Sequence, residues 1–197
     1  MRKAFIYRSL VIMFCLSAQI VRAEEALSAA EREKALELLK SVNRLHTRNE
    51  LAAMGGKVLP VLWVECQKPT VTDDELAWIF AVVAKIPGDR ERFVERAVKQ
   101  LSKQKIQTFD LFSALYLIKV TKSSKYAPDV AKRLCASDIL SINVAETLVA
   151  IGTEKELLAL EAWMKKDGRP DSDIIKKLMR EKIEGLRDRL AKEKKSD

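Results

Sequence analysis

The sequence predicts an all-helical protein: an α-α superhelix, that is, a solenoid of about four helical hairpins with a C-terminal capping helix. Apolar residues recur at intervals of three and four along almost every segment, which is the spacing of one helical face. No segment alternates apolar and polar residues as a strand does, and the 197 residues include only 6 glycines and 5 prolines. An apolar pair before a turn also returns every 32 or 33 residues, a period typical of stacked helical hairpins.

Residues 1–23 have the pattern of a cleaved signal peptide. Three basic residues precede a mostly apolar run of 13 residues, Ser9 to Val21, and Ala23 ends the expected cleavage site. A membrane anchor needs about 20 apolar residues, and Phe14 is too bulky to precede a lipidated Cys15. We therefore expect a periplasmic or secreted protein with no stable membrane span in its mature form.

The chain that remains after cleavage carries a modest positive charge. The sequence has 36 Lys and Arg against 28 Asp and Glu, and four of the basic residues lie in the leader, which leaves 32 against 28, or +4. A nucleic-acid-binding domain usually has a much stronger basic balance, and export would separate the chain from such a partner. We expect no nucleic-acid partner, one helical domain over residues 24–191 and a charged tail over 192–197.

Each expected helix begins at a capping or turn signal and continues as an apolar stripe. The expected N-caps are Ser28, Thr72 or Asp73, Thr153 and Ser172. Ser28 and Thr153 are each followed three residues later by a glutamate, as in a capping box. In chain order, the stripes run over 35–45, 58–62, 76–86, 93–101, 109–120, 130–135, 144–151, 157–164 and 175–190, and a short segment over 49–54 ends at Gly55-Gly56.

The helix over Thr108–Val120 is apolar almost all round. A helix of this composition is buried on most sides, so we place it at the middle of the stack. We expect Leu115 and Ile118 to face the partner helix of their own hairpin. Leu111 and Leu117 are expected to contact neighbouring hairpins.

The repeat is defined by apolar pairs three residues apart, each just before a turn. These pairs are Leu51/Met54, Val83/Ile86, Leu115/Ile118 and Leu148/Ile151. After the last pair, Gly152 suits a left-handed residue that ends a helix. One hairpin cannot bury its apolar stripes alone, so the pattern favours stacked copies, with a plain helical bundle as the alternative.

Two segments resemble the short bacterial HEAT-type repeat. Residues 151–157 place an Ile-Gly turn before a helix that bears leucines, and residues 55–62 are similar to the proline-containing second helix of that family. The likeness covers residues 49–167, although Pro87-Gly88 and the longer turn over 121–125 depart from it. The resemblance implies a curved right-handed stack that binds other macromolecules, and it implies no catalytic residues.

The sequence contains no constellation typical of catalysis, cofactor binding or metal binding. His46 is the only histidine, so a histidine base has no partner of its kind, and a place just past an expected helix end suggests a cap on carbonyl groups. No zinc-binding, nucleophile-elbow or phosphate-loop motif occurs. Asp73-Asp74-Glu75 could bind a cation, but at a helix start these residues are expected to cap N–H groups. We predict no enzyme and no cofactor.

Cys66 and Cys135 remain after cleavage, in a compartment that permits disulfides. They lie two hairpins apart, and stacked helices are about 8–10 Å apart, which puts the cysteines on the order of 20 Å from each other. A disulfide needs α-carbons within roughly 7 Å. We therefore expect two buried free thiols.

Two features are candidates for partner binding. Arg92, Arg96, Lys99 and Lys103 line one face of a helix, which is either an ordinary solvated face or a docking strip for an acidic protein or an anionic envelope surface. Trp78 lies about 200° around its helix from the start of the apolar stripe, where it either packs against a neighbouring hairpin or anchors a partner. We expect an exported, non-enzymatic protein-binding module. The alternative is an envelope enzyme or small-ligand-binding protein with a pocket in the concave face.

Overall fold

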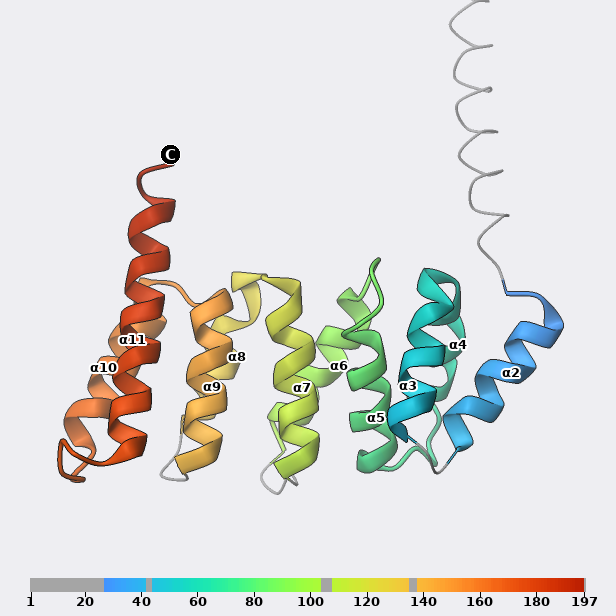
Figure 1. Cartoon of the computed structure of the whole chain (residues 1–197), viewed down its shortest axis with the longest axis horizontal. Helices are drawn as coiled ribbons and strands as arrows, with labels where there is room; N and C mark the ends of the chain where they lie inside the picture. The colour runs from blue at the N-terminus through green and yellow to red at the C-terminus, as the bar shows by residue number, and fades with distance from the viewer. Residues whose placement is uncertain (1–26, 42–43, 104–107, 135–137, 197) are drawn as a thin grey trace, which may run out of the picture.

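The computed structural model describes residues 27–41, 44–103, 108–134 and 138–196, and the regular structure in these ranges is entirely helical (Figure 1). The α-helices are α2 (Ala29–Lys40), α3 (Arg44–Ala53), α4 (Leu59–Cys66), α5 (Asp73–Val83), α6 (Glu91–Leu101), α7 (Thr108–Thr121), α8 (Ala127–Ala131), α9 (Asp138–Ile151), α10 (Glu154–Lys166) and α11 (Ile174–Glu193). Two short 3₁₀ helices, η1 (Gly55–Val58) and η2 (Ser124–Tyr126), precede α4 and α8. The all-helical prediction is confirmed for this part of the chain. The expected signal peptide, residues 1–23, lies outside the described residues.

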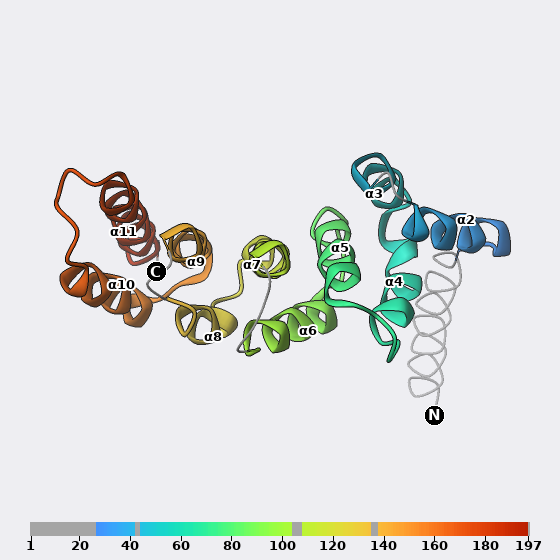
Figure 2. The ribbon, with the colours of Figure 1, turned by 90° about the horizontal axis from the view of Figure 1, so that it is seen from below.

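The helices form two curved rows (Figure 2). The inner row holds α3, α5, α7, α9 and α11 and lies on the concave side of the curve, whereas the outer row holds α4, α6, α8 and α10. Along the inner row, α3 packs against α5, α5 against α7, α7 against α9 and α9 against α11. The outer-row helices α6 and α8 pack against α7 and α9 respectively, and α2 lies at the N-terminal end against α3 and α4.

The repeating apolar pairs mark the core that the two rows share. They lie in the last turns of α3, α5, α7 and α9 or just after them, and seven of the eight side chains are buried, with Met54 half-buried. Removing a side chain such as Leu or Ile from water stabilises the fold by about 1.5–3 kcal/mol. The period in the sequence therefore corresponds to successive inner helices that contribute to one hydrophobic core.

The central helix α7 is buried on most sides, as predicted, but one face is open. Its buried apolar side chains include Leu111, Leu115, Leu117 and Ile118. In contrast, Phe109 is 51% exposed and Tyr116 is 45% exposed. These two aromatic residues lie two helical turns apart, so the open side of α7 is a single face.

The helix starts follow the predicted caps with one exception. The backbone N–H groups of Ser28, Thr72 and Thr153 donate to the glutamate three residues later at 2.8, 2.7 and 2.9 Å, and all three sites are complete capping boxes. For α11 the predicted cap Ser172 is wrong. Asp173 caps this helix instead, with Oδ1 accepting two backbone N–H bonds, because a carboxylate is favoured at the positive end of the helix dipole.

Gly152, between α9 and α10, has a different role from the one predicted. Its φ is not positive, so it is not a left-handed terminator. A Cβ at this position would lie 2.6 Å from the carbonyl oxygen of Leu148 and 3.3 Å from a methyl carbon of Leu186 in α11. The position needs glycine because the backbone of α9 and the side chains of α11 approach it closely.

The two ends of the chain also differ from the predicted helices. The sequence predicts one stripe over 35–45, but α2 ends at Lys40, Ser41 is extended, and α3 begins at Arg44. At the other end, α11 continues to Glu193, so the expected tail over 192–197 begins inside the helix. Within the described ranges, no helix has the length and apolar character needed to cross a membrane.

Candidate functional site

The four basic residues predicted as a docking strip lie on α6, in the outer row, and their environments differ. Arg92 and Arg96 are half-buried, whereas Lys99 and Lys103 are exposed. The guanidinium of Arg92 lies 5.1 Å from the centre of the Trp63 ring in α4, a cation–π distance. Arg92 therefore joins α6 to α4, which leaves less of it available to a partner.

Lys103, at the other end of this set, is held by the start of α5. Its Nζ lies 2.6 Å from Oδ1 of Asp73, and Gln100 Nε2 donates to the same oxygen at 3.1 Å. The hydrogen bond from Lys103, followed in effect by that from Gln100, lowers the pKa of Asp73. Asp73 thus contacts α6, and the adjacent Thr72 caps the helix. Lys99 is the one member of the strip that is both exposed and without an ion-pair partner among the described residues.

Trp78 lies in the core and not on an exposed surface. Its side chain is 5% exposed, and its Nε1 is buried with no acceptor in the described part of the chain. The residue forms part of the wall of two separate hollows, one bounded by α2, α4 and α5 and the other by α3, α5 and α7. The sequence predicts that Trp78 either packs against a neighbouring hairpin or anchors a partner, and its buried position corresponds to packing.

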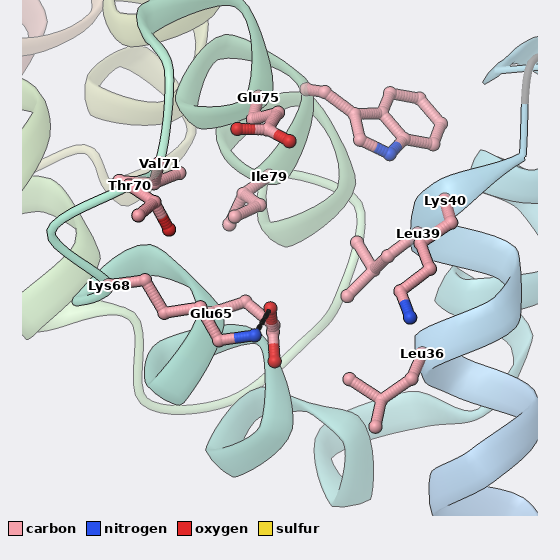
Figure 3. Close-up of a pocket in the computed structure, with 10 residues that line it drawn as sticks. Leu36, Leu39, Lys40, Glu65, Lys68, Thr70, Val71, Glu75 and Ile79 are labelled. Carbon is pink, nitrogen blue, oxygen red and sulfur yellow. Dashed lines mark ion pairs between the residues drawn. The ribbon is translucent and has the colours of Figure 1, made fainter.

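The first hollow, the α2–α5 hollow, is shown in Figure 3 and has a volume of about 210 Å³. Its apolar walls are Leu36, Leu39, Val71, Trp78 and Ile79. The Lys68 ammonium at the rim pairs with Glu65 at 2.5 Å. Lys40, also at the rim, has no partner in the described ranges. The hollow therefore combines apolar walls with the unpaired Lys40 and with two carboxylates, of which Glu65 pairs with Lys68 and Glu75 belongs to the capping box of α5.

The second hollow, the aromatic hollow, opens on the concave side and has a volume of about 340 Å³. Its lining residues are Arg48 from α3, Trp78 and Ala81 from α5, and Phe109, Phe112, Ser113 and Tyr116 from α7. All three helices belong to the inner row (Figure 2). Because the outer row covers the other side of these helices, the exposed aromatic rings face the concave side.

Charged groups of both signs lie on the helices that form the aromatic hollow, and Arg48 is the one that lines it. Arg48 has no ion pair or hydrogen bond among the described residues, and its Nε is buried without an acceptor. Lys85, which joins α5 to α3, donates to the neutral amide oxygen of Asn49 at 2.9 Å. Further along the row, Glu146 of α9 accepts a hydrogen bond from Lys119 of α7 and lies 3.9 Å from Nζ of Lys182 of α11. Two lysines thus share one carboxylate.

Asp110 is a buried carboxyl group that has no hydrogen-bond or ion-pair partner among the described residues. It follows Phe109 on α7, is 5% exposed, and its Oδ2 has no donor in the described part of the chain. Burial, with smaller contributions from the nearby charges of Asp73 and Asp74, raises the pKa of Asp110. Charge at this position is therefore unfavourable, and no feature of the sequence indicated it.

The remaining reactive side chains are inert or paired. Burial raises the pKa of the Cys66 thiol to about 11, so the thiolate form is rare at neutral pH. Cys135 lies outside the described residues. His46 belongs to the first turn of α3 and pairs with Glu50 at 2.7 Å, so the predicted cap beyond a helix end is wrong. Over the described ranges, no cluster of three or more His, Cys, Asp or Glu side chains could hold a metal ion.

The aromatic hollow is the functional candidate that sequence reasoning missed. Phe109, Phe112 and Tyr116 recur at spacings of three and four, which places them on one face, but their apolar character predicted burial. The only sequence signal was Ser113, a small polar residue between them. No family model, curated protein or solved structure matches this chain. The HEAT-like resemblance therefore remains a prediction.

Proposed function

We propose that the mature chain is an exported, non-enzymatic protein-binding module, a HEAT-like solenoid of about four helical hairpins in which α11 covers the C-terminal end. The observation that carries this proposal is the aromatic hollow on the concave side. Exposed aromatic residues and arginine are the side chains that most often dominate binding energy in protein interfaces. Phe109 and Tyr116 expose about half of their surface beside Arg48.

The solenoid part of the proposal is supported by the agreement between sequence period and helix order. The apolar pairs return every 32 or 33 residues, and each falls at the end of the next helix of the inner row. Contacts run between neighbouring helices along the rows. Helical repeats stacked in this way commonly present a concave surface to a partner.

Export is supported by the basic, apolar and small-residue regions of residues 1–23. The protein recovered from its native host should begin at Glu24 or within one or two residues of it. Mass spectrometry of the intact protein measures this directly. A retained leader in most of the protein would contradict export without affecting the proposed binding surface.

Protein binding is tested by capture with matched variants. The chain with a C-terminal tag, purified from its native host after crosslinking, should retain a partner. The double variant Phe109→Ser/Tyr116→Ser should lose that partner, because it removes the exposed rings without changing buried residues. Leu158→Ser is the control, since Leu158 is 64% exposed but lies on α10 in the outer row. An identical set of proteins on all three baits would contradict the proposal.

A second candidate function, small-ligand binding, rests on the α2–α5 hollow. Its apolar walls, the unpaired Lys40 and the buried N–H of Trp78 suit a small apolar carboxylate. A thermal-shift screen of such acids tests this candidate, with Leu39→Trp as a variant that fills the hollow. A ligand that raises the melting temperature of the wild type but not that of the variant would favour this function.

A further inference from the structure

We propose that the aromatic hollow binds a short protein segment in which a large apolar side chain is followed or preceded closely by Asp or Glu. The apolar side chain packs against Phe109, Phe112 and Tyr116, and the carboxylate pairs with Arg48. This inference rests on the proposed protein-binding function and adds the chemical class of the partner.

The apolar half of the recognition follows from the exposure of α7. Phe109 and Tyr116 are the exposed aromatic residues of this face, and Phe112 between them is half-buried. Trp78 and Ala81 close the hollow from the side of α5. An apolar side chain placed here would remove aromatic surface from water on several sides, which is the main source of favourable free energy in protein interfaces.

The acidic half follows from Arg48. A guanidinium presents five N–H donors, and a carboxylate can accept two of them at once. Arg48 has no such acceptor among the described residues, and its buried Nε makes no hydrogen bond. A partner carboxylate would supply the missing acceptor beside the aromatic rings, in a setting where surrounding apolar groups exclude water and strengthen the pair.

The charge inside the hollow favours the same partner, whereas the charges around it are mixed. Lys85 contacts only a neutral amide oxygen on this face, and Lys119 and Lys182 share the carboxylate of Glu146. Acidic groups also lie on α5 and α7, where Asp73 and Asp74 act on Asp110 next to Phe109, so the preference for an acidic segment rests on Arg48, the charged residue that lines the hollow. A carboxylate placed beside Arg48 is attracted to it, and an ammonium group there is repelled.

Single-stranded nucleic acid also combines stacking rings with negative charge, and the structure favours a protein over it. Binding of that kind uses a positively charged groove that tracks the backbone over several nucleotides. Here only Arg48 is an unpaired cation in the hollow itself, and Glu146 places a carboxylate on the same face. The site thus provides one cationic contact next to one apolar contact.

A peptide-display selection on the immobilised mature chain tests the proposal. Enriched peptides are synthesised with a fluorophore, and their affinity is measured by fluorescence anisotropy. Peptides selected by the wild type should contain a large apolar residue within two positions of Asp or Glu. Phe109→Ser/Tyr116→Ser should abolish their binding, Arg48→Gln should weaken it at least tenfold, and Leu158→Ser should leave it unchanged. Circular dichroism melts of each variant establish that it is folded.

A charge exchange gives the decisive comparison. Replacing the acidic residue of the peptide by Lys should abolish binding to the wild type, and Arg48→Glu should restore it. Peptides that depend on Phe109 and Tyr116 but tolerate this replacement would overturn the acidic part of the inference and leave the proposed function standing. A poly-dT oligonucleotide that binds more tightly than any selected peptide, and requires the same two rings, would overturn the protein class. Failure to select any peptide, together with no captured partner, would overturn both proposals.

Discussion

Asp110 is held by the fold in a place that suits its protonated form. Its carboxyl is buried, its Oδ2 has no donor among the described residues, and burial together with Asp73 and Asp74 raises its pKa. A carboxyl group with a raised folded-state pKa binds its proton more tightly in the folded protein than in the unfolded chain. Below its ordinary pKa, the carboxyl group is protonated in both the folded and the unfolded state, so it does not lower the free energy of unfolding. The cost of burying its charge develops as the pH rises through the folded-state pKa.

Asp110→Asn should stabilise the protein at neutral pH. The change removes the charge that burial disfavours while keeping the size of the side chain, so the variant should unfold at a higher urea concentration than the wild type at pH 7. The gain should shrink toward pH 3, where the wild-type carboxyl is protonated in both states. Urea unfolding at several pH values measures the difference. Asp188→Asn, an exposed position on α11, is the control, and an equal gain from it would contradict the explanation.

Gly152→Ala should destabilise the protein by about 1–3 kcal/mol, the usual cost of forcing extra atoms into a packed site. The new Cβ would meet the backbone oxygen of Leu148 at 2.6 Å, and this oxygen is fixed by the α9 helix. Gly168→Ala is the control because a Cβ there meets nothing within 4 Å. Thermal melts of both variants measure the effect. Similar melting temperatures for the two would show that the turn accommodates the methyl group.

At the scale of elements, α11 is fixed to α9 through the end of α9. Arg189 Nε donates to the carbonyl oxygen of Val149 at 2.8 Å, and its Nη2 donates to the carbonyl oxygen of Gly152. These carbonyls belong to the C-terminal end of α9, where intrahelical donors are missing and the dipole is negative. At Gly185 of α11, an added Cβ would lie 3.6 and 3.9 Å from the methyl groups of Val149, an ordinary packing distance, so the approach of α11 to α9 does not depend on this glycine.

Arg189→Ala should therefore lower the free energy of unfolding by about 1.5–3 kcal/mol, the range for hydrogen bonds to charged groups. Arg187→Ala is the matched control on the same helix. Arg187 forms an ion pair with Glu161 at 2.8 Å, and its side chain is more than half exposed, so its loss should cost less than about 1 kcal/mol. Chemical unfolding of both variants provides the measurement. An equal decrease in the free energy of unfolding for the two variants would mean that the hydrogen bonds of Arg189 to α9 stabilise the protein no more than the ion pair of Arg187 does.

The sequence was sufficient to locate the helices but not the open face of α7. Capping boxes and apolar stripes identified the helices because both signals are local: Thr153 and Glu156 are three residues apart wherever the hairpin lies. The open face of α7 could not be found in this way. Phe109 and Tyr116 are as apolar as their buried neighbours, and their exposure depends on the gap that α3 and α5 leave beside them.

The contacts of the site residues with other helices could not be predicted from the sequence either. The spacing of Arg92 and Lys103 correctly placed them on one helix, but it contained no information about Trp63 and Asp73, which lie on other helices and hold them. Arg48 attracted no attention in the sequence because an arginine on an amphipathic helix is common. It stands out only because no carboxylate of the described residues pairs with it.

At the scale of the whole molecule, contacts are local along the chain. The helix pairs that share the most contacts are near neighbours in sequence, such as α5 with α7, α7 with α9 and α9 with α11. No substantial contact joins the described helices of one end to those of the other, such as α3 to α11. In such an arrangement stability is approximately a sum of terms from each unit and its neighbours, so the two ends can open independently.

Native-state hydrogen exchange of Arg189→Ala tests this independence. The variant weakens the junction of α9 and α11 at the C-terminal end, so backbone amides in α9, α10 and α11 should exchange faster than in the wild type. Amides in α3, α4 and α5 should exchange at unchanged rates, because no described contact carries the loss to them. Arg187→Ala should leave exchange nearly unchanged at both ends. An equal acceleration of exchange in every helix would show that the two rows unfold as one cooperative unit. In that case, a partner bound at the aromatic hollow would stabilise α11 as much as α5.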